Sequence, residues 1–386
     1  MSGAFENLVW HYQNHSVEAL AQHKAGMPVV GFTSNTVPWE LIRAAGCFPV
    51  LIGPGSDALG KPTPLADSFM EPVFDSRIRA LFNEILSGAW SFLRLLIIPR
   101  TSEPEHKLYL YLREVDRQKM SNQQPPVYLY DLLHTRSPIS RKYGIDRTNE
   151  LIECLRQIGP INAETLSGAI RESNAARRAL RRLQNLRRGS APRISGSQAQ
   201  TIAGAMYFMD RAAYAKLVDQ VCREYRSAKL LRGPRFLIKG VPLHHAQLHE
   251  ALEAQGAVVV AEDDWWGSRA VDANIPPARG SASMVKAVFE NYYLHAPSPR
   301  VSPAAAADRW FQRAVRREID GVVFYLPPED DVYGWDFPRQ RDFLRERGIP
   351  SLLIREDSRR GLSGDTRARV QDFIKTIRRR PHASRS

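Results

Sequence analysis

The sequence predicts an α/β protein with two Rossmann-like, doubly wound parallel-sheet domains joined by a helical segment. Three observations support this: short apolar runs alternate with helical stretches in the first part of the chain, the middle is almost wholly helical, and the alternation restarts near residue 235. Ligands of such sheets bind beyond the carboxyl ends of the strands, so we expect a site in the cleft between the two domains. The expected units are an N-terminal α/β domain over 1–150, a helical segment over 151–232 and a C-terminal α/β domain over 233–386.

The first half contains a β–α–β unit, the building block of a parallel sheet. The run MPVVGFTSN (27–35) predicts a strand ending in a turn, VPWELIRAAG (37–46) a helix, and CFPVLIG (47–53) a second strand. Pro38 suits the first turn of this helix, and Gly46 suits its C-terminal stop. The other expected elements are helices over 1–25, 76–88 and 107–115 and strands over 94–99 and 126–133.

The middle of the chain shows the helical period, interrupted by GSAPRISGSQAQ (189–200), whose Gly, Ser and Pro predict a loop. The alternation of strands and helices then returns. We expect strands over 235–240, 257–263, 320–327 and 349–357, and helices over 246–256, 283–296, 341–348 and 365–380.

Composition sets broad limits. The chain has 386 residues, 43% apolar and 25% charged, as is ordinary for a globular protein. Its apolar runs are strand-sized, too short for a bilayer, and its N-terminus lacks the charged-then-apolar order of a secretory signal. We therefore expect a cytoplasmic protein without a membrane partner.

The three cysteines, Cys47, Cys154 and Cys222, are widely separated and form no CxxC pair. They cannot supply several disulfides or a four-thiolate metal site. A cluster or zinc ion held by this chain would need other ligands or a partner's thiolates.

The net charge of +13 favours phosphate-bearing partners, such as an anionic surface or coenzyme A. Arginines are concentrated in residues 171–188, where they are either the solvated face of an amphipathic helix or a phosphate-contacting patch. Nucleic acid is disfavoured because no zinc-finger, RRM, KH or helix-turn-helix pattern accompanies the charge. The arginines of this segment include Arg177, Arg178, Arg181, Arg182, Arg187 and Arg188.

The stretch EDDWWGSR (262–269) follows a predicted strand, where ligands of parallel sheets bind. Trp265 and Trp266 either stack on a substrate or an adenine ring, or belong to the core. Arg269 is the best-placed residue for a phosphate or carboxylate of coenzyme A. Asp264 is a candidate catalytic acid or base.

A second candidate site lies at the turn after the first strand. Ser34, Thr36 and Glu40 stand at a strand end and the start of a helix, where backbone N–H groups and a hydroxyl can bind a thioester carbonyl or a phosphate. We predict catalytic roles for Ser34 and Glu40 and a substrate contact for Thr36. Helix capping is an equal alternative, since Asn35 or Thr36 before Pro38 is a good N-cap.

Other polar clusters suggest metal or acid–base chemistry more weakly. His245 and His249 have the i, i+4 spacing of zinc ligands, but with His244 they lack the H-E-x-x-H pattern, so we expect no metal there. The acidic clusters 262–264 and 329–331, with Glu103, are either solvated loop acids or a cation or acid–base site. Of the two, we expect solvated loop acids.

SNTVPWELIRAAGCFPVLIG (34–53) resembles the opening signature of the 2-hydroxyacyl-CoA dehydratase and benzoyl-CoA reductase family, that is, the 2-hydroxyglutaryl-CoA dehydratase D-component. Its small hydroxyl residues precede P-x-E-L/I and then A-A-G. Segments similar to the family follow in the right order, and DTRARVQDFI resembles its ending. The similar segments are SRIRALFNEILSGAW, LLIIPRTSEPEHKLYLYLRE, AVVVAEDDWWGSRAV and DGVVFYLPPEDDVYGWDFPRQRDFLRERGIPSLLIRED.

The resemblance implies two Rossmann-like domains plus helices and a heterodimer of two related subunits. It implies a four-iron cluster held by cysteines at the cleft of catalytic subunits, and a separate ATP-driven iron–sulfur activator that injects one electron. The implied chemistry is reductive, either removal of water from a 2-hydroxyacyl-CoA (a lyase) or reduction of an aromatic acyl-CoA ring (an oxidoreductase).

This chain departs from the family at the cluster positions. Where the resemblance places cysteines, it has Phe74 or Asp75, Ser102 and Trp266, and LPPEDDVYG (326–334) contains no cysteine either. Iron clusters need thiolate ligands, and indole is not one. We therefore expect no cluster in this chain and a [4Fe–4S] cluster only in a partner subunit.

Three hypotheses follow. The chain is a cluster-less subunit that binds acyl-CoA or supports a cysteine-bearing paralogous subunit, with the activator as a further partner. Alternatively, it is an independent non-redox acyl-CoA enzyme, which predicts a closed pocket lined by Glu40, Glu103, Asp263 or Asp264 with raised pKa values. As a third possibility, it is a non-enzymatic scaffold whose segment 171–188 binds a polyanion with strong salt dependence.

Overall fold

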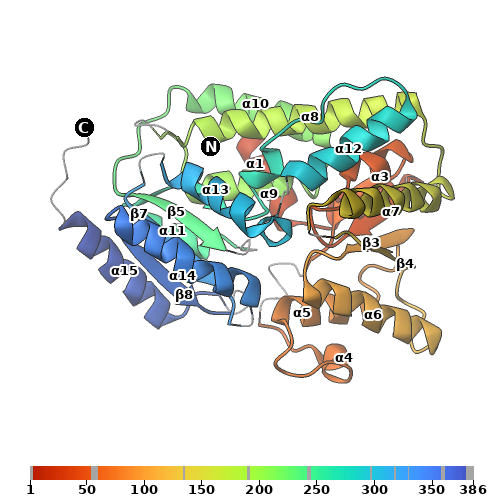
Figure 1. The fold of residues 1–386 in the computed structure, drawn as a ribbon, viewed down its shortest axis with the longest axis horizontal. Coiled ribbons are helices and arrows are strands. Elements are labelled where there is room, and N and C mark those ends of the chain that lie inside the picture. Colours follow the sequence, from red (N-terminus) through yellow and green to blue (C-terminus); the bar gives the residue numbers. More distant parts are fainter. Residues whose placement is uncertain are drawn as a thin grey trace.

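A computed structural model of the chain describes most of its residues (Figure 1). The described residues are 3–53, 60–133, 135–188, 192–240, 245–295, 298–316, 319–328, 330–357 and 361–379.

The strands form two four-stranded sheets in which every neighbouring pair is parallel. The order is β2-β1-β3-β4 in the first and β6-β5-β7-β8 in the second, so the two halves share one topology. The predicted fold class, two Rossmann-like domains with helices, is confirmed. The strands are β1 (Val29–Phe32), β2 (Phe48–Leu51), β3 (Leu95–Pro99), β4 (Val127–Tyr130), β5 (Arg235–Gly240), β6 (Val258–Asp263), β7 (Gly321–Leu326) and β8 (Ser351–Arg355).

Helices connect the strands within each half, and four more helices lie between the two halves in the sequence. Those of the first half are α1 (Gly3–Gln13), α2 (Val17–Lys24), α3 (Trp39–Ala44), α4 (Pro64–Asp67), α5 (Ser76–Leu86) and α6 (Glu103–Arg117). The middle ones are α7 (Pro138–Arg156), α8 (Ala163–Asn185), α9 (Gly196–Ala205) and α10 (Arg211–Tyr225). The last are α11 (Gln247–Ala254), α12 (Ser281–His295), α13 (Ala304–Val315), α14 (Asp331–Glu346) and α15 (Gly364–Arg378), with 3₁₀ turns η2 (Arg269–Val271) and η3 (Pro299–Val301).

Some predicted elements differ from the structure. The helix expected over residues 1–25 is two helices, α1 and α2. Helix α9 begins inside the segment predicted as a loop over 189–200. Ser195 and Gln198 form a capping box at its start, with each side chain bonded to the other residue's backbone N–H. Helix α13 was not predicted at all.

The second sheet is buried on both faces because helices pack on each, and successive side chains of a strand point to opposite faces. On β7, Val323 and Tyr325 face the core shared with α11 and α15. Val322 and Phe324 face the core shared with α13 and α14. Figure 1 shows α11, α14 and α15 around this sheet.

The first sheet and the middle helices, α8 among them, share one continuous core. Figure 1 shows α8 and α10 lying side by side along one edge of the molecule. Trp265 and Trp266, which follow β6 of the second sheet, belong to this first core. Helix α7 begins at Pro138, so the helical layer starts before residue 151. The three-unit division remains a prediction.

Among the described helices, none has a long enough apolar stretch to cross a lipid bilayer.

Candidate functional site

The turn after β6 buries both tryptophans. Asp264 shapes it, because its Oδ1 accepts hydrogen bonds from the backbone N–H groups of Trp266 (2.9 Å) and Gly267 (3.2 Å). Trp266 is 1% exposed, and its indole N–H donates to the carbonyl of Gln200 at 3.2 Å. These contacts fix Trp266 as part of the interior.

Aromatic rings surround Trp266. Its ring lies 5.2 Å from that of Tyr207, 5.3 Å from Trp265 and 6.2 Å from both Tyr12 and Phe208, measured between centroids. Gly204 of α9 makes room for the cluster, since a Cβ there would lie 2.6 Å from the Trp266 ring. These contacts support the interpretation of Trp266 as a core residue.

The same turn joins the two halves of the chain. The Asn35 side-chain amide, just after β1, donates to the Trp265 carbonyl at 2.5 Å. The Tyr207 hydroxyl lies 3.3 Å from the carbonyls of both Trp265 and Trp266. The carboxyl ends of β1 and β6 are thus tied together.

Three buried hydroxyl groups meet at the ends of β1 and β3. The side-chain oxygens of Ser34, Thr36 and Thr101 lie within hydrogen-bond distance of one another, at 3.0, 2.8 and 2.6 Å. We call this set the hydroxyl cluster. It brings together the predicted residues Ser34 and Thr36, and adds Thr101, which the sequence reading missed. None of the three caps α3, whose N-cap is Pro38.

Glu40 lies in a buried ionic network and not in an open cleft. It accepts hydrogen bonds from Arg177 (2.7 Å), the Tyr292 hydroxyl (2.9 Å) and the Ser173 hydroxyl, and Arg211 lies 3.9 Å away. Burial alone raises the pKa of Glu40, but the two guanidinium groups outweigh it and hold the pKa below its usual value. Its predicted catalytic role remains a prediction.

The acids at 262–264 are all buried, so the solvated alternative is wrong for them. Glu262 pairs with Arg187 at 2.8 Å and with His249 at 3.0 Å. Asp263 pairs with Lys239 (2.7 Å) and Arg269 (2.6 Å). Both pKa values are lowered despite burial, because the partner cations outweigh it.

Asp264 differs from its neighbours, because it has no cationic partner among its described hydrogen bonds. Burial, reinforced by the negative charge of Glu262, raises the pKa of Asp264 to about 7. A carboxyl group with such a value can exchange a proton near neutrality. Its side chain lines none of the three hollows described below.

In the second acidic cluster, Asp330 is buried, caps α14 by accepting from the Tyr333 N–H (3.1 Å), and pairs with Arg300. Asp330 is therefore not a solvated acid. Glu329 lies outside the described residues. Glu103 opens α6, with a largely exposed side chain.

The positions where the family resemblance places cysteines serve helix starts and packing. Asp75 caps α5 through the Ile78 N–H (2.8 Å), and Ser102 caps α6 through the Glu105 N–H (3.4 Å). The Phe74 ring meets Tyr111 edge-on at 6.2 Å between centroids. With Trp266 in the aromatic cluster, these side chains do not fit an iron–sulfur cluster, which needs thiolates.

A cation lies among these helix starts. Arg300, in η3, is largely buried and pairs with Asp330. Burial lowers the pKa of its guanidinium, but the negative charges of Asp330, Asp75 and Glu105 more than reverse this. The acids at the starts of α5, α6 and α14 therefore favour the charged form of Arg300.

As a group, the arginines of 171–188 form neither the solvated face of an amphipathic helix nor a phosphate-contacting patch. Arg177 and Arg187 are buried in the ion pairs with Glu40 and Glu262. Arg181 donates to the Val271 carbonyl. The two buried arginines thus join α8 and the turn after it to α3 and β6.

His245 and His249 likewise make structural contacts. His249 pairs with Glu262, the His245 ring accepts from the Gln247 N–H at 3.3 Å, and His244 lies outside the described residues. Across the described ranges, no group of three or more His, Cys, Asp or Glu side chains is arranged to hold a metal ion.

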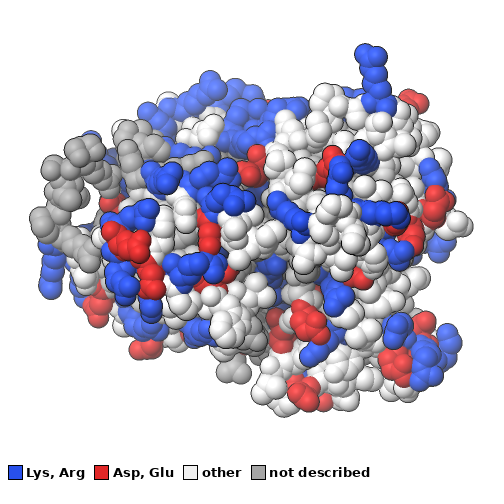
Figure 2. Space-filling view, viewed as in Figure 1, with Lys and Arg blue, Asp and Glu red and all other residues white. Residues whose placement is uncertain are grey.

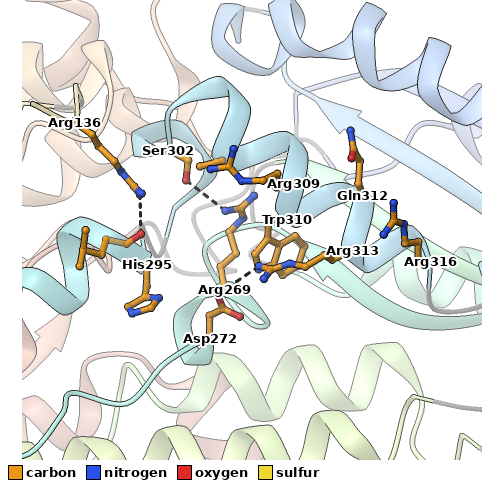
Figure 3. Close-up of a pocket in the computed structure, with 12 residues that line it drawn as sticks. Arg136, Arg269, Asp272, His295, Ser302, Arg309, Trp310, Gln312, Arg313 and Arg316 are labelled. Carbon is orange, nitrogen blue, oxygen red and sulfur yellow. Dashed lines mark hydrogen bonds and ion pairs between the residues drawn. The ribbon is translucent and has the colours of Figure 1, made fainter.

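A hollow of about 470 Å³ lies beside α13 (Figure 3). We call it the arginine pocket. Figure 3 shows Arg269 between Arg136 on one side and Arg313 and Arg316 on the other. Asp272 is the one acidic residue in the lining given for it. The arginines that line it are Arg136, Arg269, Arg309, Arg313 and Arg316.

Arg269 is the one predicted ligand contact in this pocket. Its Nε donates to Asp263, its Nη1 lies 3.4 Å from the Ser302 hydroxyl, and its guanidinium lies 4.5 Å from the centre of the Trp310 ring. Its Nη2 is buried and has no hydrogen-bond partner in the described structure. The sequence reading missed the α13 arginines, although Arg309, Arg313 and Arg316 share a helical i, i+4, i+7 spacing.

Two smaller hollows adjoin the arginine pocket. The inner hollow, of about 20 Å³, shares Arg269 and His295 with it and is also lined by Asn35, Tyr207 and Tyr292. The apolar hollow, of about 30 Å³, shares Arg136 with the arginine pocket and Tyr292 with the inner hollow. Two members of the hydroxyl cluster, Thr36 and Thr101, line the apolar hollow.

The family description "2-hydroxyglutaryl-CoA dehydratase, D-component" matches residues 35–377. The chain is 21% identical to the (R)-phenyllactyl-CoA dehydratase beta subunit of Clostridium sporogenes, covering 97% of each chain. It is 22% identical to (R)-2-hydroxyglutaryl-CoA dehydratase, subunit beta, of Acidaminococcus fermentans, over 93% of this chain and 95% of that one. The family match begins just after β1 and spans β2 to β8 and the helices between them. The chain therefore belongs to the 2-hydroxyglutaryl-CoA dehydratase D-component family.

Proposed function

We propose that this chain is a cluster-less subunit of a 2-hydroxyacyl-CoA dehydratase or benzoyl-CoA reductase type complex. It binds acyl-CoA, or supports a cysteine-bearing paralogous subunit that carries the [4Fe–4S] cluster. An ATP-dependent iron–sulfur activator serves that partner. The reductive step therefore belongs to the partner's cluster and not to residues of this chain.

One observation carries the proposal. Asp75, Ser102 and Trp266 stand at positions where the family resemblance places cysteines. Each of them has a structural role that is incompatible with binding the iron of a cluster. Asp75 and Ser102 cap helices, and Trp266 fills the interior. The relatives named above are beta subunits, which supports a role beside another subunit.

The independent-enzyme hypothesis has less support. It predicts a closed pocket lined by acids, but Glu40 and Asp263 are held in ion pairs. Neither they nor Asp264 and Glu103 line the three hollows described. The raised pKa of Asp264 is the one observation in its favour.

The test is anaerobic purification of the chain alone, of its cysteine-bearing paralogue alone, and of the two together. Iron and sulfide are assayed in each sample, and acyl-CoA binding is measured by calorimetry. We expect iron in the samples that contain the paralogue, and a stable pair that binds acyl-CoA. About four iron atoms on the lone chain would overturn the cluster-less assignment. A failure to form the pair would overturn the subunit role.

A further inference from the structure

The inner hollow is lined by buried cationic side chains. Arg177 of α8, Arg211 of α10 and Arg269 of η2 line it, and they are 4%, 5% and 3% exposed. Its lining, as far as the chain is described, includes no Asp or Glu. The three arginines are far apart in the sequence, so the fold brings their charges to one small space. Such a space favours a bound negative charge.

Glu40 is shared by two of these cations. Its carboxylate lies 2.7 Å from Arg177 and 3.9 Å from Arg211, measured from nitrogen to oxygen. Burial, with the nearby positive charge of Arg177, lowers the pKa of Arg211, and the charge of Glu40 reverses only part of this. One carboxylate thus leaves an excess of buried positive charge, which costs free energy.

Asp263 is also shared by two cations. Its carboxylate lies 2.6 Å from Arg269 and 2.7 Å from Lys239, and all three side chains are at most 2% exposed. In the networks of Glu40 and Asp263 together, four buried cations share two carboxylates. A single bound anion would reduce the difference from two charges to one and lower the repulsion between the cations.

Three buried donors of this lining have no hydrogen-bond partner within the described part of the chain. They are Nε of Arg211, Nη2 of Arg269 and Nδ2 of Asn291, which is itself 9% exposed. The hydroxyls of Tyr207 and Tyr292 also line the hollow, but each has an acceptor of its own. A buried donor without a partner costs free energy, and an anion can accept bonds from several donors at once.

The size of the inner hollow limits its ligand. Its volume of about 20 Å³ suits one species of about the size of a water molecule. Water would also satisfy the unpartnered Oδ1 of Asn35, but it would leave the excess positive charge uncompensated. A monovalent ion such as chloride compensates that charge, whereas phosphates, nucleotides and sugar acids are too large.

The arginine pocket adjoins the inner hollow on its basic side. The two share Arg269 and His295, both labelled in Figure 3. In the view of Figure 2, Lys and Arg side chains gather over the α13 region, which borders the arginine pocket. Positive potential at such a mouth raises the local concentration of anions.

We propose that the inner hollow binds one small monovalent anion, of the size of chloride, among Arg211, Arg269 and Asn291. The ion compensates part of the charge that Glu40 and Asp263 leave, and it links η2 and α12 to the start of α10. This site goes beyond the proposed function, because it requires neither a substrate nor a partner subunit. It makes the stability of the folded chain depend on the concentration of chloride.

The experiment measures urea unfolding in sodium chloride, sodium bromide and sodium gluconate at equal ionic strength. Equal ionic strength keeps the screening of surface charges the same. Gluconate is the reference because it is too large for the hollow. Asn291→Asp places a carboxylate at the proposed site. Asn185→Asp is the matched control, since it adds the same charge at the exposed end of α8.

We expect the folding equilibrium constant of the native chain to rise about tenfold when about 0.1 M chloride replaces gluconate, as for a dissociation constant of about 10 mM. Bromide should act like chloride, because it has the same charge and a similar radius. Asn185→Asp should keep the rise. In Asn291→Asp the constant should change by less than about twofold, since the new carboxylate competes with the ion.

The line width of the chlorine NMR signal tests binding directly on the native chain, whether or not Asn291→Asp folds. The folded chain should broaden the line more than the chain unfolded in urea does. Equal line widths, or a native chain whose stability is the same in chloride and gluconate, would overturn the site. A chloride effect that persists in full in Asn291→Asp would overturn it as well.

R309A/R313A separates the inner hollow from the arginine pocket, because it removes two exposed arginines that line the pocket alone. The chloride effect should change by less than about threefold in this variant, since only longer-range charge is lost. A chloride effect lost in R309A/R313A and kept in Asn291→Asp would place the ion in the arginine pocket and overturn the assignment.

Discussion

Glu40 and Arg177 form an ion pair with an N–O distance of 2.7 Å, and their side chains are 0% and 5% exposed. The pair joins α3 to α8, and the Tyr292 hydroxyl adds α12 to it. The residue that the family signature places after Pro38 therefore holds three helices together.

Glu40→Gln should lower the free energy of unfolding by about 3–5 kcal/mol, because it leaves the buried Arg177 and Arg211 cations without a counter-charge. Urea denaturation measures this. Asp219→Asn is the control, since it breaks the exposed pair with Arg182 and should cost less than about 1 kcal/mol. Equal losses in the two variants would contradict the structural role of Glu40.

Asp264→Asn should remove a pH dependence of stability. The Asp264 pKa is about 7 in the folded state and about 3.9 in the unfolded chain, so the folded state holds the proton more tightly. The stability from this group is present below about pH 4 and is lost as pH rises through about 7. Asparagine keeps the acceptor for the Trp266 and Gly267 N–H groups and does not titrate.

The measurement is urea denaturation from pH 5 to pH 8. The unfolding free energy of the native chain should fall relative to that of Asp264→Asn across this range, by up to about 1.4 kcal/mol per pH unit. Asp219→Asn serves as the control for a surface change of the same kind. Parallel curves for the native chain and Asp264→Asn would show that the carboxyl group does not titrate there.

Gly204→Ala should destabilise the protein by about 1–3 kcal/mol, because its Cβ would lie 2.4 Å from the Tyr12 ring and 2.6 Å from that of Trp266. Gly168→Ala is the matched control within a helix. The nearest atom to a Cβ there is 3.8 Å away, at the end of Arg171, so this change should stabilise by about 0.5–1 kcal/mol. Thermal unfolding of both variants tests the pair, and the same sign for both would refute it.

Trp266→Phe should lower stability by about 1–3 kcal/mol, because it leaves the Gln200 carbonyl without its indole donor and opens a small void. Coenzyme A affinity should stay within about twofold of the native value. Trp335→Phe, at a side chain 81% exposed, should change neither quantity. Weaker coenzyme A binding without loss of stability in Trp266→Phe would restore the stacking alternative.

The elements that the sequence predicted well are those with a strong local signal. Apolar runs such as AVVVAED become strands because four to six consecutive apolar residues suit a sheet buried on both faces. Where the local signal was mixed, prediction failed. Gly and Ser over 189–200 indicated a loop, yet Ser195 and Gln198 form the capping box that starts α9.

The candidate site was harder because its partners are distant in sequence. Arg177 lies 137 residues from Glu40, so no spacing rule identifies it as the counter-charge of a buried acid. Ser34 and Thr36 were found because they lie in the strand-end signature, whereas Thr101 joins them only through the pairing of β1 with β3. The α13 arginines were missed because the helix itself was missed.

The burial of Trp265 and Trp266 in the core of the first half limits how this protein can move. Many enzymes built from two nucleotide-binding-type domains open and close about a hinge. Here a hinge opening would draw both indoles from their contacts with Tyr207 and Tyr12 and expose roughly 300–500 Å² of apolar surface. That exposure costs on the order of 10 kcal/mol, so entry to the interior depends on side-chain rearrangement around a fixed frame.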